Sequence, residues 1–232
     1  MNIYKNNTRK IIQNQSPYNL YNETIHKYPI VVSIPHSGVL ITQDMAENLR
    51  ENIILPNMDW YIPKLYSFLK NLNVTVIINN MSRYVIDPNR NPNMNKGNSY
   101  LNNVIYETTT FGFPMYKKPL DNKIKETRKV KYYIPYHNEL TKLLYEKKKY
   151  FEKVYLIDLH SYGMDTGSDV VIGNCFDKSC SYKFRIFIKN LLEKQNLIVN
   201  ENTPFSGGYI TQNYGNIKNI EAIQIELCYR FY

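Results

Sequence analysis

The side chains best suited to chemistry in this sequence lie where apolar runs stop. The run "YLIDLH" stops at His160, close to Asp158, and the run "VVSI" is followed by Pro35 and His36. Two histidines and a carboxylate, with one coordination position left open, form the ligand set of a catalytic zinc ion. A single histidine beside a strand is more often structural, so a metal site is indicated only if other parts of the chain supply partners.

Polar residues also accompany two further apolar runs. The run "RYVID" leads into Pro88, Asn89 and Arg90, and Glu226 lies inside the apolar run "AIQIEL". A buried glutamate is costly unless it is paired with a cation such as arginine or has a catalytic task, and both alternatives are open for Glu226. Because ligands of open α/β sheets bind beyond the carboxyl ends of the strands, these residues are expected to meet at one edge of a sheet.

The elements that position these residues alternate between apolar runs and helical stretches. Continuous apolar runs are typical of strands in a sheet that is covered on both faces. The pattern predicts an α/β fold, with a single three-layer domain, a mixed, mostly parallel sheet and helices on both faces. Strands are predicted at 28–34, 74–79, 83–87, 154–160, 169–174, 197–200 and 222–230, and helices at 42–52, 58–72, 135–153 and 179–195.

Two stretches lack these patterns. Residues 1–27 are polar and are predicted to be an irregular N-terminal arm, so that the domain covers 28–232. Residues 88–130 are rich in Asn, Pro, Gly and Thr and are predicted to form one long excursion. A loop of that length in a compact domain usually contributes to a site.

The composition narrows the possible functions. The chain has 232 residues and a net charge of +9, but its 29 basic residues are scattered and mostly lysine, so nucleic-acid binding is not expected. No run reaches the length of a membrane span and the first residues lack the apolar core of a secretory signal, so no membrane association is expected. The three cysteines do not form an even disulfide set and favour a cytoplasmic location.

Eight motifs in order along the chain together resemble the N-formylglutamate amidohydrolase (N-formylglutamate deformylase) family. The resemblance covers the chain from about residue 30 onward, and its most specific parts are "SRYVIDPNR" and "GGYIT" followed by "YG". The other motifs are "PHSG", "DWYIPKLYSF", "TTTFGFPMY", "PYHNEL", "DLHS" and "AIQIELCYRFY". The family is in turn similar to zinc carboxypeptidases and aspartoacylases, which implies their fold and a metal between strand ends.

The resemblance implies one zinc ion (Zn2+) per chain, held by His36 and His160 through imidazole nitrogens. Asp59 is the implied third ligand. The family pattern here is Asp-x-Asp-Trp, and this chain has Asn57 in the first position. Asp158 is an alternative ligand, or it orients His160 by accepting a hydrogen bond from the outer ring nitrogen.

The resemblance also implies catalytic and substrate-binding residues. Glu226 is the implied general base, which takes a proton from the attacking water and passes it to the leaving amine. Arg83, Asn89 and Arg90 are implied to hold substrate carboxylates, because a guanidinium binds a carboxylate through two parallel hydrogen bonds. One of the two arginines could instead polarise the scissile carbonyl. The residues expected to close over the pocket are Tyr136, His137 and Tyr209.

The implied function is zinc-dependent hydrolysis of the N-acyl amide of an acidic amino acid, foremost N-formyl-L-glutamate to formate and L-glutamate. The chain departs from the family at 111–113, where it has "FGF" in place of an Asp-Gly after the Phe. A related amidase or peptidase acting on another N-acyl amino acid is therefore an alternative, and a non-catalytic binding module on the same fold is a second. The expected partner is a small-molecule substrate, and the sequence does not define an oligomeric state.

Overall fold

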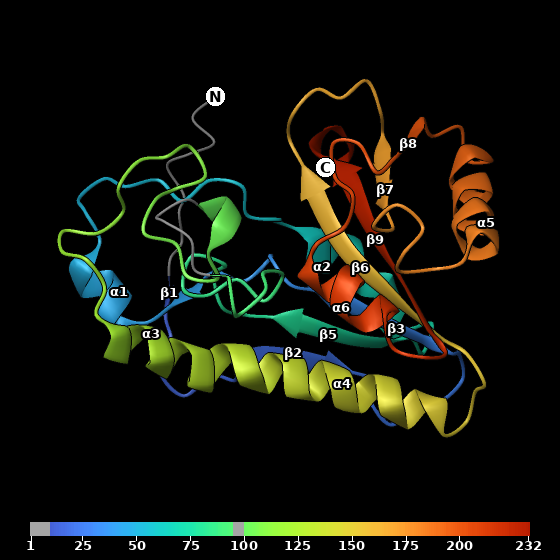
Figure 1. The fold of residues 1–232 in the computed structure, drawn as a ribbon, viewed down its shortest axis with the longest axis horizontal. Coiled ribbons are helices and arrows are strands. Elements are labelled where there is room, and N and C mark those ends of the chain that lie inside the picture. The colour runs from blue at the N-terminus through green and yellow to red at the C-terminus, as the bar shows by residue number, and fades with distance from the viewer. Residues whose placement is uncertain (1–9, 95–99) are drawn as a thin grey trace.

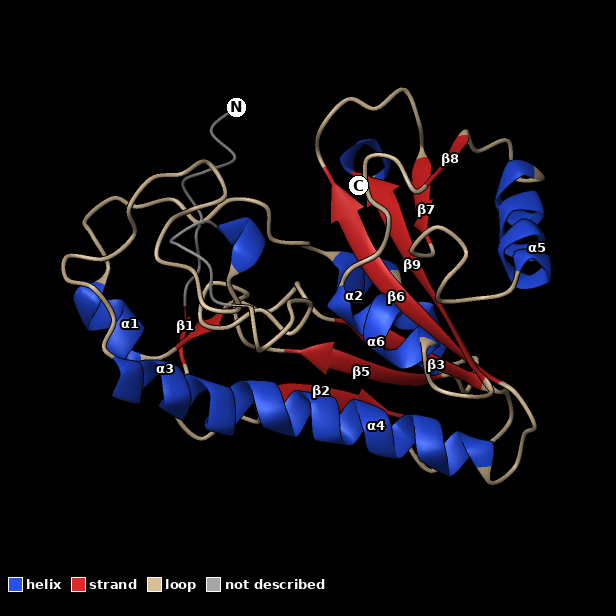
Figure 2. Cartoon of the chain, in the orientation of Figure 1, coloured by secondary structure: helices blue, strands red, loops and turns tan. Residues whose placement is uncertain are grey.

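A seven-stranded sheet forms the centre of the computed structural model, which describes residues 10–94 and 100–232. Its strand order is β2-β5-β3-β6-β9-β7-β8 (Figures 1 and 2). The run β5-β3-β6-β9 is parallel, whereas β2 pairs antiparallel with β5 and β7 pairs antiparallel with β9. The predicted α/β fold with a mixed, mostly parallel sheet is confirmed.

The longest strands, β6 and β9, pair side by side over their whole length. In their register His160 lies opposite Glu226, so two of the predicted site residues are neighbours across the sheet. A separate short parallel pair is formed by β1 and β4. The strands are β1 (Lys10–Ile11), β2 (Tyr18–Tyr21), β3 (Ile30–Ile34), β4 (Leu40–Ile41), β5 (Thr75–Asn79), β6 (Val154–Tyr162), β7 (Val170–Gly173), β8 (Val199–Glu201) and β9 (Ile220–Cys228).

Helices cover both faces of the sheet. Successive residues of β3 belong to different apolar clusters: Val31 packs in the cluster under α4 and α6, and Val32 packs in the cluster under α2. A third cluster lies between the sheet and α5. Burial on both faces explains why the central strands are continuously apolar. The helices are α1 (Gln43–Asn48), α2 (Ile62–Leu65), α3 (Asn122–Arg128), α4 (Ile134–Lys148), α5 (Tyr182–Glu193) and α6 (Tyr209–Gly215).

The helices α3 and α4 are joined into one long rod, seen along the lower edge of Figure 1, by a π-helical turn over Lys129–Tyr133. Pro135 lies just after this turn. Because proline has no backbone N–H and its ring collides with the carbonyl four residues earlier, regular α-helical bonding cannot continue through it. A wider π-helical turn accommodates this interruption. The Tyr133 hydroxyl then donates a hydrogen bond to the Arg90 carbonyl at 2.9 Å.

The predicted strand at 83–87 is wrong. These residues form a buried turn, in which the Val85 N–H donates to the Ser82 carbonyl at 2.9 Å and Arg83 pairs with Asp87 at 2.8 Å. The apolar side chains of the turn fill an apolar lobe beside the sheet, together with residues of α1 and of the segment 105–120. Burial in that lobe produces the same apolar run as a central strand.

The prediction of an irregular arm over 1–27 is corrected in part, because β2 adds an antiparallel strand to the sheet beside β5. Tyr18 and Leu20 of β2 pack against the cluster under α4, which explains their apolar character. Residues 1–9 lie outside the described part of the chain.

The first two helices are shorter than predicted, and the excursion at 88–130 ends earlier. Tyr61 adopts a left-handed backbone conformation with φ 65°, so that α2 begins only at Ile62. At the other end of the excursion, α3 already begins at Asn122, capped by the Asp121 side chain.

No helix within residues 10–94 and 100–232 combines the length and the apolar composition that crossing a membrane requires.

A test of the apolar lobe concerns its buried cation. Arg128 is 1% exposed and pairs with Asp44, and it also donates to the Val85 carbonyl and the Tyr116 hydroxyl. Asp44→Ala leaves this cation buried without its counter-charge, so we expect a loss of about 3 kcal/mol in the free energy of unfolding. Arg128→Met should cost less, because the Asp44 side chain is 35% exposed and can be solvated by water.

Urea denaturation of both variants measures these losses. Lys142→Ala, which removes a cation that is 64% exposed, is the control and should leave the unfolding free energy nearly unchanged. Equal losses in Asp44→Ala and Lys142→Ala would show that the Arg128 ion pair contributes nothing to stability.

Candidate metal centre and active site

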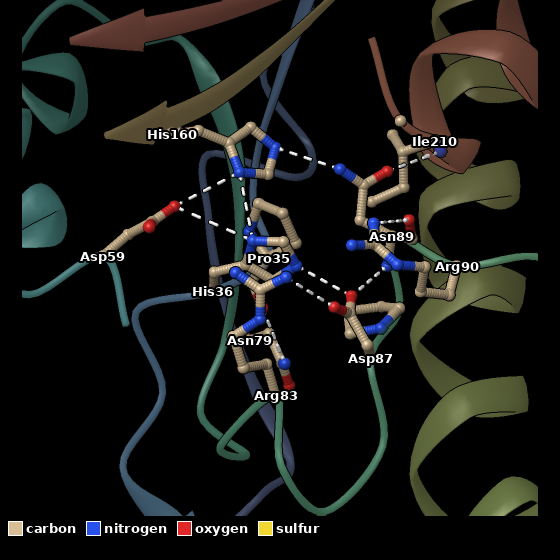
Figure 3. Close-up of polar contacts among 12 residues, drawn as sticks. Pro35, His36, Asp59, Asn79, Arg83, Asp87, Asn89, Arg90, His160 and Ile210 are labelled. Atoms are coloured by element: carbon tan, nitrogen blue, oxygen red, sulfur yellow. Dashed lines mark hydrogen bonds and ion pairs between the residues drawn. The ribbon is translucent and has the colours of Figure 1, made fainter. Parts of the chain in front are cut away.

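Three possible metal ligands converge beyond the sheet, as Figure 3 shows. His160 Nδ1 lies 3.1 Å from His36 Nδ1 and 3.2 Å from Asp59 Oδ2, and the His36 Nδ1 to Asp59 Oδ2 distance is 3.8 Å. Donors around a tetrahedral zinc with bonds of about 2.0–2.1 Å lie roughly 3.3 Å apart, so the spacing fits such an ion. All three side chains are buried. These are the three ligands that the resemblance implies.

Two parallel strands and one turn bring these ligands together. His160 lies within β6, and His36 follows the end of the neighbouring strand β3. The Asp59 N–H donates to the His36 carbonyl at 3.3 Å, which ties the turn before α2 to the end of β3. Asn57, which stands where the family pattern has an Asp, donates its side-chain N–H to Thr110 Oγ1 at 2.9 Å and is not part of the cluster.

Each histidine uses its outer ring nitrogen to contact a buried carboxylate. His36 Nε2 lies 2.7 Å from Asp87 Oδ1, and His160 Nε2 lies 2.8 Å from Asp158 Oδ2. When each ring is neutral with its proton on Nε2, the Nδ1 atom that faces the cluster carries the lone pair that a metal ion requires. Asp158 thus contacts the outer nitrogen of His160, whereas Asp59 lies beside the two Nδ1 atoms.

The two histidines differ in electrostatic environment. Burial, assisted by the charge of Arg83, lowers the pKa of His36 to about 4, so its ring is neutral near pH 7. Burial also lowers the pKa of His160, but the charge of Asp158 and hydrogen bonds to Asp158 and Asp59 outweigh it and raise that pKa above its ordinary value. The carboxylates of Asp158 and Asp59 thus favour positive charge next to His160.

Asp87 is a site residue that the sequence analysis missed. Its Oδ1 accepts from His36 and from the Asn89 N–H, and its Oδ2 accepts from Arg83 and from the Tyr106 hydroxyl. Burial alone would raise the pKa of Asp87, but His36 and Arg83 hold it well below its ordinary value. Its position two residues before Asn89 and Arg90 could have identified it as a site residue. The prediction of a strand over 83–87 instead treated it as part of that strand.

Glu226 has a different environment. Its side chain is buried, and its Oε1 accepts a hydrogen bond from Gln224 Nε2 at 2.8 Å. No basic side chain among the described residues lies within ion-pair distance of Glu226. The structure therefore does not show the structural glutamate–arginine pair that was the alternative to a catalytic role. Burial raises the pKa of Glu226 to about 7, which suits a group that takes up and releases a proton near neutral pH.

Gln224 also connects Glu226 to the glycine-containing loop, because its Oε1 accepts from the Gly208 N–H at 2.8 Å. That loop lies directly against Asn89. A Cβ added to Gly208 would lie 2.3 Å from Asn89 Nδ2, so only glycine permits this approach. Asn89 Oδ1 in turn accepts from the Ile210 N–H at 2.8 Å.

The two arginines lie at different depths. Arg83 is buried; its Nη1 donates to the Asn57 carbonyl at 3.2 Å and its Nη2 to Asp87, whereas its Nε is buried and has no partner. Arg90 is half-buried and contacts the carbonyls of Asn89 and Tyr100. Arg83 therefore lies at the inner side of the site, beside Asp87, and Arg90 lies nearer solvent.

The residues expected to close over the pocket have other partners in the structure. The Tyr136 hydroxyl is buried and lies 2.9 Å from Ser33 Oγ. Both ring nitrogens of His137 are engaged, with the Pro88 carbonyl at 2.9 Å and the Tyr214 hydroxyl at 3.0 Å. Tyr209 opens α6, with its ring edge-on to His137. His137 and Tyr209 contact the backbone of Pro88 and Asn89, and substrate contacts from all three residues stay a prediction.

Comparison with known proteins agrees with this arrangement. A sequence model of the N-formylglutamate amidohydrolase family matches residues 28–232. The chain is 29% identical to the N-formylglutamate deformylase of Pseudomonas putida over 219 residues, which cover 89% of this chain and 82% of the relative. It is 27% identical to the N-formylglutamate deformylase of Pseudomonas aeruginosa over 216 residues, which cover 87% of this chain and 80% of the relative.

Solved structures share the fold. The crystal structure of N-formylglutamate amidohydrolase from Ralstonia eutropha superposes with a TM-score of 0.78 at 21% identity, covering 94% of this chain and 88% of the other. A gene product of Agrobacterium tumefaciens superposes with a TM-score of 0.75 at 17% identity, covering 92% of this chain and 84% of the other. Because the family model extends over most of the sequence, the chain belongs to the N-formylglutamate amidohydrolase family.

Proposed function

We propose that this protein is a zinc-dependent amidohydrolase that converts N-formyl-L-glutamate and water to formate and L-glutamate. The observation that carries the proposal is the convergence of His36, His160 and Asp59. Glu226, which is buried and has no ion-pair partner within the described residues, lies opposite His160 in the register of β6 and β9. The relatives in the two Pseudomonas species are named for this substrate. The free thiols of all three cysteines support a reducing compartment such as the cytoplasm.

The three donors suit zinc by type and spacing, and their outer hydrogen bonds orient them toward it. Bound there, the ion would make water more acidic and polarise the scissile carbonyl. Arg83 is the buried arginine beside the cluster, because it pairs with Asp87, which also contacts His36, and its Nε has no hydrogen-bond partner within the described residues. We therefore assign Arg83 to polarisation of the carbonyl.

Glu226 performs the proton transfer in this mechanism. It removes a proton from the water whose oxygen attacks the formyl carbon, and it then delivers that proton to the amine nitrogen as the C–N bond breaks. A pKa of about 7 supports both steps, because the group is neither a strong acid nor permanently protonated. Gln224 supports the orientation of the carboxylate through its hydrogen bond to Oε1.

The glutamate half of the substrate carries two carboxylates, which require basic partners. Arg90 is half-buried beside Asn89, and Asn89 is held by the Ile210 N–H next to His160. We assign substrate carboxylate binding to Asn89 and Arg90, because a planar guanidinium can donate two parallel hydrogen bonds.

The metal ligands can be tested by zinc content. His36→Ala, His160→Ala and Asp59→Ala should each purify without zinc, because a site with three protein ligands tolerates no loss. Asp158→Asn keeps all three donors and should weaken zinc binding only about 10–100-fold. Metal analysis and competitive chelator titration measure both effects, with His26→Ala as the control. Stoichiometric zinc in Asp59→Ala together with none in Asp158→Asn would make Asp158 the ligand.

The role of Glu226 can be tested by Glu226→Gln, which preserves size and removes the proton acceptor. We expect a folded, zinc-containing protein with kcat lower by at least about 100-fold. Glu221→Gln is a matched control in the same strand, because Glu221 pairs with Lys153 at the far end of β9. Near-normal turnover by Glu226→Gln in a formate-release assay would remove Glu226 from the mechanism.

The carboxylate role of Arg90 can be tested by comparing two substrates. Arg90→Ala should raise KM for N-formyl-L-glutamate, with a loss of about 2–5 kcal/mol in binding if the pair is desolvated, and should change KM for N-formyl-L-leucine less. Arg90→Lys should restore only part of the loss. Arg50→Ala, an exposed arginine, is the control. An unchanged KM for N-formyl-L-glutamate in Arg90→Ala would exclude this role.

A further inference from the structure

Tyr229 lies between the two chain segments that carry His160 and Asp59. Its ring packs against Gly163, where an added Cβ would lie 2.7 Å from Cδ2 and 2.9 Å from Cε2 of the ring. Its hydroxyl donates to the Met58 carbonyl at 3.3 Å. Gly163 follows His160 by three residues in the chain, and Met58 directly precedes Asp59, so the ring bridges the gap between these two ligand segments.

Two further tyrosines extend this ring into an aromatic wall, defined as Tyr61, Tyr229 and Tyr232. Tyr232 packs edge-on against Tyr229 with ring centroids 5.8 Å apart, and against Tyr61 at 6.4 Å. Tyr61 lies two residues after Asp59. Burial, and then the negative charge of Asp59, raise the pKa of the Tyr229 hydroxyl.

The wall lies on the side of the site opposite the substrate carboxylate residues. Figure 3 shows Asp59 on one side of the two histidines and Asn89 and Arg90 on the other. A substrate whose carboxylates contact Arg90, and whose scissile carbonyl lies at the histidines, therefore directs its acyl group toward Asp59. Tyr229 contacts Met58, the residue before Asp59, so its ring lies on the side toward which this acyl group is directed.

The reacting groups are closely packed, since His160, Asp59 and Glu226 are only 2%, 3% and 6% exposed. A formyl group carries only a hydrogen on its carbonyl carbon, whereas an acetyl group carries a methyl that must fit against the wall. In closely packed sites one additional methyl group is enough to discriminate between substrates.

We propose that Tyr229, backed by Tyr61 and Tyr232, forms the subsite for the acyl group and restricts it to one carbon. The inference deepens the proposed function and rests on it. Tyr229 is thus a specificity-determining residue: it selects the acid that is released, while Arg90 selects the amino acid.

The test compares kcat/KM for N-formyl-, N-acetyl- and N-propionyl-L-glutamate, with glutamate release as the assay. Tyr229→Ala should raise the acetyl-to-formyl ratio of kcat/KM by about tenfold or more, because one methyl group in a pocket is worth about 10–200-fold. Tyr229→Phe retains the ring and should keep the wild-type ratio. Tyr182→Ala, a 65% exposed tyrosine on α5, is the matched control.

Each outcome bears on the proposal. An acetyl-to-formyl ratio that stays at the wild-type value in Tyr229→Ala, with both substrates slowed equally, would make Tyr229 purely structural and overturn the inference. Tyr229→Leu replaces Tyr229→Ala if the alanine variant does not fold in a thermal unfolding assay, and should shift the ratio in the same direction. A wild-type protein that cleaves none of the three substrates would refute the proposed function, which is a distinct result.

Discussion

The carboxylate of Asp87 is fully buried and accepts hydrogen bonds from four groups, two from its own turn (Arg83 and the Asn89 N–H) and two from other segments (His36 and Tyr106). An ionised carboxylate without water is stable only while such donors remain in place, so each donor is held to one geometry. This constraint places a proposed metal ligand, His36, and a proposed carbonyl-polarising group, Arg83, on the two oxygens of one side chain. The arrangement of the site therefore depends on it.

Asp158 holds the second histidine in a similar way. Asp158 accepts from His160 Nε2 and from the Ser33 hydroxyl at 2.6 Å, and Ser33 contacts the Tyr136 hydroxyl of α4. The cluster is thus oriented by two buried carboxylates that do not themselves belong to it. Because these supporting groups are packed in the core, they hold both rings with Nδ1 facing the cluster.

Burial acts to raise the pKa of two carboxylates of the site, but only one of them has neighbours that outweigh it. Asp87 has cationic and hydrogen-bonding neighbours, which hold its pKa well below the ordinary value. Glu226 has no basic partner among the described residues, and burial raises its pKa to about 7. Groups whose pKa values are driven apart in this way can take different roles at one pH, a permanent anion in the first case and a proton carrier in the second.

The sequence by itself determined the sheet and much of the cluster. Strands buried on both faces must be continuously apolar, so β3, β5, β6, β7 and β9 were predictable, and polar residues at their ends marked His36, His160 and Glu226.

The sequence did not determine whether the apolar run at 83–87 is a strand or a buried turn, since both environments select the same residues. Only the tertiary structure decided that, and with it the position of Asp87. It also decided that both nitrogens of His137 are occupied and that Tyr229 reaches the Asp59 segment. Such contacts join residues far apart in the chain, and local periodicity carries no information about them.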